Sequence, residues 1–316
     1  MLHRRAFTAS VFWTLGLLYL GSVVHATESS LACPDWPTCF GSWTPEMSGG
    51  VFWEHLHRLV AGGLLLLWGT GTWMARREGA PRWVFRAALA GMGLLVVQSV
   101  FGGLTVIFEL PDLVSTTHFT LAFGFLALAA FLASATSWSR RHRLAPESGR
   151  TVVRWAGGAA LLVYGQSVVG ALVRHTDAGM ACPDAPLCLG QVVPPLQNGL
   201  VALHFGHRVL GVVAAGVVLA FAWQAGRRVL PRVVRSWAAW AGALVLFQVA
   251  LGFLSVLSGL AVVPVSLHTL VAASLLVVLT HLTALGWVAT RRTPDEVGTD
   301  DPAGSSRVAS PPPAGT

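Results

Sequence analysis

The sequence Glu54-His55-Leu56-His57-Arg58 returns about 150 residues later as His204-Phe205-Gly206-His207-Arg208. Each copy stands at the start of a long apolar run, and Pro81-Arg82 returns at the same interval as Pro231-Arg232. The repeat predicts that one four-helix unit is present twice in the chain.

The composition is that of a helical membrane protein. Hydrophobic residues make up 54% of the chain and charged residues 11%, and apolar runs long enough to cross a bilayer recur throughout. We therefore predict an all-α polytopic membrane protein with eight transmembrane helices in two pseudo-symmetric four-helix bundles. The expected spans are 10–26, 51–74, 84–107, 113–136, 153–173, 200–225, 234–257 and 265–290. We expect an N-terminal half over 1–140, a C-terminal half over 141–292, and a disordered cytoplasmic tail over 293–316, which is polar and rich in Pro, Gly and Ser.

The arginines predict the orientation. They gather in the short connections on one side of the expected spans, whereas the connections on the other side carry half of the acidic residues and a single arginine, Arg174. We expect the chain in the plasma membrane. By the positive-inside rule, both termini are expected in the cytoplasm, and the loops 27–50 and 174–199 are expected to face outward. The positive charge is therefore explained by the lipid bilayer and does not indicate nucleic acid.

The N-terminus has two interpretations. Arg4-Arg5 and the apolar residues that follow also fit a cleavable signal peptide. We expect a retained first helix instead, because Gly21-Ser22-Val23-Val24 before Cys33 resembles Gln166-Ser167-Val168-Val169 before Cys182, in the middle of the chain.

Both long outer loops carry a cysteine pair with two prolines. The first reads Cys33-Pro34-Asp35-Trp36-Pro37-Thr38-Cys39 and the second Cys182-Pro183-Asp184-Ala185-Pro186-Leu187-Cys188. Thiols outside the cytoplasm tend to oxidise, so a disulfide within each loop is favoured over zinc, for which the spacing is unusual. A structural role is favoured over redox catalysis.

Four histidines form two matching pairs. His57 and His118 are expected at similar depth in the first half, and His207 and His268 in the second. Histidine inside a bilayer is rare and usually faces the bundle interior. Two imidazoles can bind both faces of a heme iron, and this interpretation is favoured over hydrogen-bonded structural histidines and over a divalent metal ion.

Other polar residues near the motif received simpler interpretations. Glu54 is the only carboxylate expected in either pocket, and it can pair with Arg58 at i, i+4. Arg58 and Arg208 are candidate heme propionate contacts, with snorkelling toward headgroups as the alternative. His281 is expected to make a polar contact between helices, and His25, His55 and His175 to have a solvated or headgroup role near the outer surface.

Taken together, these motifs resemble the heme A synthase family over about residues 10–290. The resemblance implies two four-helix halves and oxidation of the C8 methyl of heme O to a formyl group, which gives heme A for terminal cytochrome oxidase. It implies that Glu54 is catalytic, that His57 and His118 bind the substrate heme, and that His207 and His268 ligate the iron of a permanent heme b. It also implies a bridge between Cys33 and Cys39.

The implied partners are heme O, handed over by a heme O synthase, an electron donor or acceptor, and a second copy of the chain in a homo-oligomer. Two other classes stay open. A di-heme electron-transfer cytochrome b would hold two equivalent hemes, and a heme-delivery or oxidase-assembly protein would bind heme without altering it.

The cysteine pairs give the first testable prediction. We expect Cys33 to bridge Cys39 and Cys182 to bridge Cys188 on the outer side of the membrane. A membrane-impermeant thiol reagent should label them from outside only after reduction. Labelling from the cytoplasmic side, or a bridge between the two loops, would contradict the expected topology.

Overall fold

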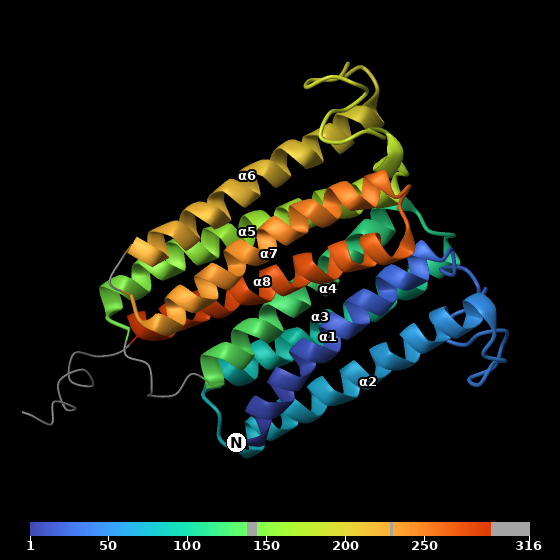
Figure 1. Ribbon diagram of the computed structural model, residues 1–316. Coiled ribbons are helices and arrows are strands. Elements are labelled where there is room, and N and C mark those ends of the chain that lie inside the picture. The colour runs from blue at the N-terminus through green and yellow to red at the C-terminus, as the bar shows by residue number, and fades with distance from the viewer. Residues whose placement is uncertain (138–143, 228–229, 292–316) are drawn as a thin grey trace, which may run out of the picture.

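The computed structural model describes residues 1–137, 144–227 and 230–291, and the described part consists of long helices joined by loops (Figure 1). The N-terminal half contains α1 (Leu2–Ala26), α2 (Gly49–Arg77), α3 (Arg82–Ile107) and α4 (Asp112–Ser137). The C-terminal half contains α5 (Pro146–His175), the short 3₁₀ helix η1 (Ala178–Met180), α6 (Gly199–Arg227), α7 (Arg232–Leu257) and α8 (Val262–Thr290). The all-α prediction with eight long helices is confirmed. The expected boundary at 140–141 and the expected tail at 293–316 lie outside the described residues.

Proline marks the start of four of these helices, and Pro111 directly precedes α4. Pro81 and Pro231 cap α3 and α7, and Pro146 is the first residue of α5. A proline at this place loses no helical hydrogen bond, because the first N–H groups of a helix have no partner within it. The repeated Pro-Arg pairs therefore set the same start for α3 and α7.

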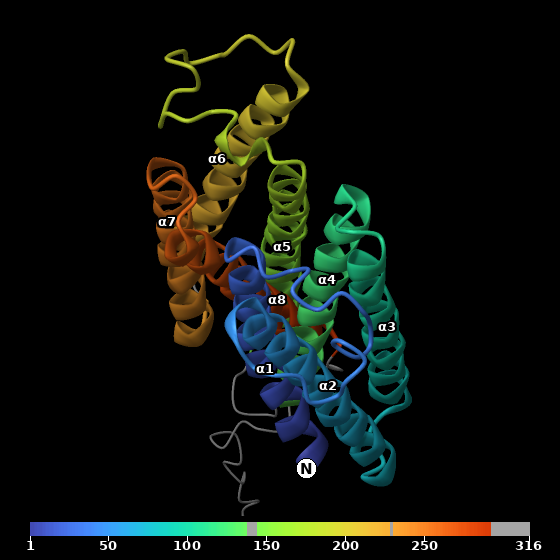
Figure 2. The same cartoon turned by 90° about the vertical axis from the view of Figure 1, so that its right-hand side faces the viewer.

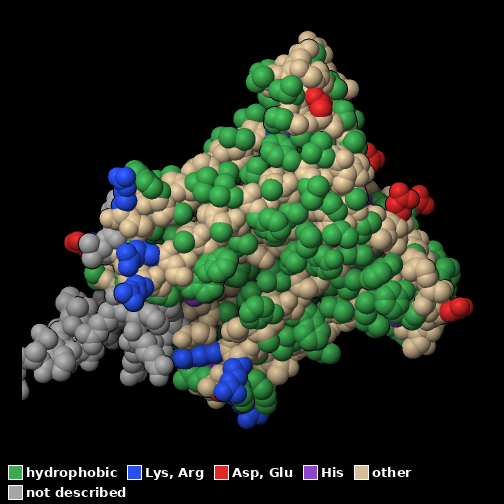
Figure 3. Space-filling model, in the orientation of Figure 1, with side chains coloured by type: hydrophobic (Ala, Val, Ile, Leu, Met, Phe, Trp, Pro, Cys, Tyr) green, Lys and Arg blue, Asp and Glu red, His purple; other side chains and the backbone are tan. Residues whose placement is uncertain are grey.

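The molecule is a multi-pass membrane protein. Within the described residues, seven helices are long and apolar enough to cross a bilayer; α2 is as long as the others, but its polar motif and its glycines and threonines lower its hydropathy. Large apolar side chains face outward along the outer helices, as lipid contact requires; Leu66 is 74% exposed and Val212 67% exposed. Arginines gather at one end of the bundle and acidic residues at the other (Figure 3).

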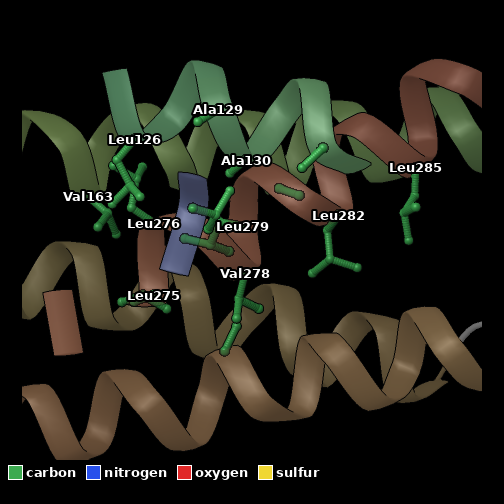
Figure 4. Packing of buried hydrophobic residues seen from close by; sticks show 14 of the residues in the cluster. Leu126, Ala129, Ala130, Val163, Leu275, Leu276, Val278, Leu279, Leu282 and Leu285 are labelled. Atoms are coloured by element: carbon green, nitrogen blue, oxygen red, sulfur yellow. The ribbon is translucent and has the colours of Figure 1, made fainter. Parts of the chain in front are cut away.

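The two halves join through their inner helices. α1 and α4 of the first half pack against α5 and α8 of the second, while α2, α3, α6 and α7 lie outside (Figures 1 and 2). At the core, leucines of α8 such as Leu276 and Leu279 lie among Leu126 and Ala130 of α4 (Figure 4). α5 and α8 approach most closely at two glycines, where a Cβ atom on Gly149 would lie 2.8 Å from the carbonyl oxygen of Gly286.

Candidate functional site

The four histidines of the sequence motif occupy equivalent places in the two halves. His57 lies on α2 and His118 on α4, and His207 and His268 lie on α6 and α8. Each ring lies against a glycine of the preceding helix, so close that a Cβ atom there would crowd the ring carbon Cε1. The distances from that Cβ position are 3.0 Å for Gly21 to His57, 2.9 Å for Gly102 to His118, 2.8 Å for Gly170 to His207 and 3.1 Å for Gly252 to His268.

This contact corrects the register that the sequence suggested for the first helix of each half. Gly21 is equivalent to Gly170, because both meet the same histidine carbon from the same side. The expected match of Gly21 with Gln166 is wrong by one helical turn, since both segments contain a Ser-Val-Val run that aligns equally well without a structure.

All four histidines line one cavity of about 1500 Å³ that extends through both halves. This volume exceeds that of an ordinary single-ligand pocket, about 300–1000 Å³. Several buried polar atoms around it have no hydrogen-bond partner among the described residues. They are Nδ1 of His57 and Oε1 of Gln98, Gln166 and Gln248. The cavity thus combines an apolar wall with imidazoles and unused polar atoms.

Glu54 connects the cavity with the first outer loop. Its carboxylate is 4% exposed and accepts hydrogen bonds from the N–H of Cys33 at 2.8 Å and from Nη2 of Arg58 at 2.5 Å. The expected i, i+4 pair with Arg58 is confirmed. The expectation that no other carboxylate borders the pocket is wrong, because Glu28 and Asp177 line the cavity as well. Both are exposed, so Glu54 is the buried one of the three.

His204, which replaces Glu54 in the second half, makes a different contact. Its Nδ1 lies 2.9 Å from the carbonyl oxygen of Ala178. The imidazole can donate a hydrogen bond to this loop carbonyl, whereas the Glu54 carboxylate accepts a hydrogen bond from a loop N–H. The exchange of glutamate for histidine therefore accompanies a change in how the loop is attached.

Arg58 and Arg208 hold the two outer loops. Arg58 donates from Nη1 to the carbonyl oxygens of Asp35 at 2.7 Å and Thr38 at 2.6 Å. Arg208 donates in the same way to Asp184 at 2.9 Å and Leu187 at 2.6 Å. Each arginine thus has a defined task in fixing a loop, and contact with heme propionates stays a prediction.

Both loops contain the expected disulfides, Cys33–Cys39 and Cys182–Cys188. Among the described residues, no three His, Cys, Asp or Glu side chains come together as a metal-ion site. The loops differ in what they cover. Trp36 of the first loop packs against Gly103 of α3, where a Cβ atom would lie 2.7 Å from the ring, whereas the second half has Ala185 and Phe253 at the matching positions.

The other histidines are less exposed than expected. His55 is 4% exposed and its Nε2 lies 3.1 Å from the carbonyl oxygen of Trp43. His25 and His175 are partly buried and contact each other where the two halves meet, with ring centroids 5.4 Å apart. The expected solvated role is wrong for these three, because the outer loops and the partner half cover the helix ends. His281 makes the expected polar contact, with Nδ1 2.9 Å from Oγ of Ser134 on α4.

Arg174 is a cavity residue to which sequence analysis assigned no role. Its guanidinium donates to Oγ and to the carbonyl oxygen of Ser22 on α1, both at 2.9 Å, and so joins the two halves. The available signal was its position as the single arginine among the acidic outer connections.

Asp35 orders the first outer loop and gives a prediction on pH. It accepts from the hydroxyl of Thr38 and from the N–H groups of Phe40 and Gly41, and these bonds, led by the one from Thr38, lower the pKa of Asp35. A lowered pKa means that the loop is stabilised above the unfolded pKa of about 3.9 and loses this support as the pH falls through the lower folded value.

We therefore expect Asp35→Asn to raise hydrogen exchange at the amides of Phe40 and Gly41 at neutral pH. In the wild type, protection of the same amides should decline only below about pH 4. Glu46→Gln, in the same loop at an exposed position, serves as the control. Equal protection in Asp35→Asn and wild type would show that the aspartate does not hold the loop.

Comparison with known proteins agrees with this arrangement. Residues 46–280 match the model of the COX15-CtaA family, described as cytochrome oxidase assembly protein. The chain is 32% identical over 262 residues to the heme A synthase of Symbiobacterium thermophilum, covering 79% of this chain and 84% of that protein. It is 30% identical over 287 residues to the heme A synthase of Lysinibacillus sphaericus, covering 86% and 92% of the two chains. With a family match over most of its length and relatives aligned through both halves, the chain belongs to the COX15-CtaA family of cytochrome oxidase assembly proteins.

Proposed function

We propose that this chain is a heme A synthase that oxidises the C8 methyl of heme O to a formyl group. The observation that carries the proposal is the set of four histidines in two equivalent pairs along one large cavity, with a buried carboxylate in the first half only. The relatives named heme A synthase support it, and the family model matches residues 46–280, a range that contains all four histidines.

The residues present fit two hemes. Each half offers two imidazoles from helices that do not pack closely on each other, α2 with α4 and α6 with α8, so the space between them is available to a planar ligand. Nδ1 of His57 is buried without a partner among the described residues, which indicates that this ring is not placed for a hydrogen-bonded structural role alone. We assign His57 and His118 to the substrate heme and His207 and His268 to the permanent heme b.

The bound heme b supplies one-electron transfer between the substrate site and an external electron partner. Conversion of a methyl to a formyl group removes hydrogens and electrons and adds oxygen, so the substrate site needs a proton acceptor. Glu54 is buried one helical turn from His57, and it is the residue that we assign to this task. Its hydrogen bond to Cys33 links it to the disulfide loop, whose Trp36 and Pro37 border the cavity.

The same proposal includes heme O as the substrate, a heme O synthase as its source, an electron partner and a homo-oligomer. The orientation is also part of the proposal: the protein lies in the plasma membrane, with the disulfide loops outside the cell and the arginine-rich end in the cytoplasm. The charge separation in Figure 3 supports that orientation through the positive-inside rule. A cytochrome b without catalysis would not need a proton acceptor beside one of its two pockets, which Glu54 offers in the first half only.

The ligands of heme b can be tested separately from catalysis. His207→Ala and His268→Ala should each abolish or alter a low-spin heme spectrum, because each removes one of two axial ligands. His281→Ala is the matched control on α8, since that imidazole contacts Ser134, and it should keep the spectrum. If neither His207→Ala nor His268→Ala changed the spectrum, the heme would be bound at another site.

Glu54→Gln tests the catalytic assignment. The amide preserves size and keeps one of the two accepting oxygens but cannot take a proton, so we expect heme O or a partly oxidised heme to accumulate while heme b stays bound. Mass spectrometry of hemes from cells with a heme O source measures this, with Glu109→Gln, an exposed outer carboxylate, as the control.

Because Glu54 also accepts from Cys33 and Arg58, hydrogen exchange of the first loop must be compared in the same variant. An intact loop with lost heme A assigns Glu54 to chemistry. Heme A at the wild-type rate would remove that assignment and leave Glu54 as the structural partner of Arg58.

A further inference from the structure

The two halves support their equivalent histidines differently. In the second half, Nε2 of Gln166 lies 3.0 Å from Nδ1 of His207 and donates to the backbone oxygen of the same residue at 2.9 Å. In the first half, Nδ1 of His57 is buried and has no hydrogen-bond partner among the described residues.

This difference is encoded one helical turn before the glycine that each histidine meets. Gln166 stands four residues before Gly170, and the position four residues before Gly21 is Leu17. Both Gln166 and Leu17 line the cavity. A leucine has no polar atom, so it leaves the His57 ring without a partner.

A second position has changed together with the first. A Cβ atom on Gly211 of α6 would lie 3.1 Å from Nε2 of Gln166, so the glycine provides room for the amide. Gly211 follows His207 by four residues, and Ala61 follows His57 by four residues. The second half therefore pairs glutamine with glycine, where the first half pairs leucine with alanine.

The chemistry of a heme ligand suggests what Gln166 and Gly211 do for His207. An imidazole that binds iron through Nε2 carries its proton on Nδ1, and an acceptor for that proton fixes the ring and makes it a stronger ligand. Oε1 of Gln166 is buried without a partner. Rotation of the amide would bring Oε1 to Nδ1 and give up the bond from Nε2 to the backbone oxygen of His207, so the acceptor role requires the side chain to shift away from that oxygen. Gln166 can thus accept the proton of an iron-bound His207, which Leu17 cannot do for His57.

Resting on the function proposed above, we propose that Gln166 is a positioning residue that makes His207 a permanent ligand, and that Leu17 leaves His57 as the exchangeable ligand of the substrate site. His118, the other ligand of that site, is held, since its Nδ1 donates to the carbonyl oxygen of Gln98 at 3.1 Å. One firm and one releasable ligand suit a site that must take up heme, open a coordination position and discharge its product.

Gln166→Leu copies the first half into the second. Loss of the Nδ1 acceptor should weaken ferric relative to ferrous heme binding about tenfold, which raises the heme b midpoint potential by about 59 mV for one electron. Redox titration of protein made without a heme O source measures the shift, and Ser167→Ala, whose hydroxyl bonds its own helix, is the control. Gly211→Ala, which crowds the amide by one methyl group, should shift the potential in the same direction and serves if Gln166→Leu does not fold.

The reciprocal change is Leu17→Gln with Ala61→Gly. It should slow the transfer of heme O from the first half to excess apomyoglobin about tenfold, because His57 gains the support that His207 has. A potential in Gln166→Leu and Gly211→Ala equal to that of Ser167→Ala, or unchanged heme release in the reciprocal variant, would overturn this inference. Neither outcome would affect the proposed function, which fails instead if His207→Ala and His268→Ala keep the heme spectrum.

Discussion

The contact between a histidine ring and a glycine backbone is the constraint on which the site depends. It occurs four times, in the helix pairs α1–α2, α3–α4, α5–α6 and α7–α8, and each time a Cβ atom on the glycine would crowd the ring carbon. The missing side chain lets the helices approach and fixes the direction of the imidazole. Because close-packed interiors resist small displacements, this contact determines where the nitrogen atoms lie in the cavity.

The two disulfide loops are held in place by the helices that carry the cavity histidines. Arg58 and Arg208 each follow a cavity histidine directly in sequence, and their guanidinium groups bind loop carbonyls near the disulfides. A shift of either helix would therefore move both the histidine and the loop. In the first half, Glu54 adds a carboxylate to this connection, so the candidate acid–base group and the loop above it are mechanically joined.

Division of tasks between the halves arises from a few substitutions within a conserved internal geometry. Glu54 is replaced by His204, Leu17 by Gln166, Ala61 by Gly211, and the Trp36–Gly103 contact by Ala185 and Phe253. Each exchange changes polarity or space around a histidine or above it, and none changes the helix arrangement. In the function that we propose, two pockets of one design would hold one heme firmly and process another.

The sequence by itself determined the class of protein, the eight long helices, the two repeats, the paired histidines and both disulfides. These features follow from hydropathy, from a repeat of about 150 residues and from cysteine pairs in two loops between apolar runs, and such signals can be read without knowledge of packing. Only the tertiary structure decided how α1 of the first half corresponds to α5 of the second, and which groups Arg58 and Arg208 bind. It also decided the burial of His55 and the contact of Gln166 with His207. These features depend on which side chain faces which neighbour across helices far apart in the chain, and a shift of one turn in an apolar helix leaves its hydropathy unchanged while it changes every such contact.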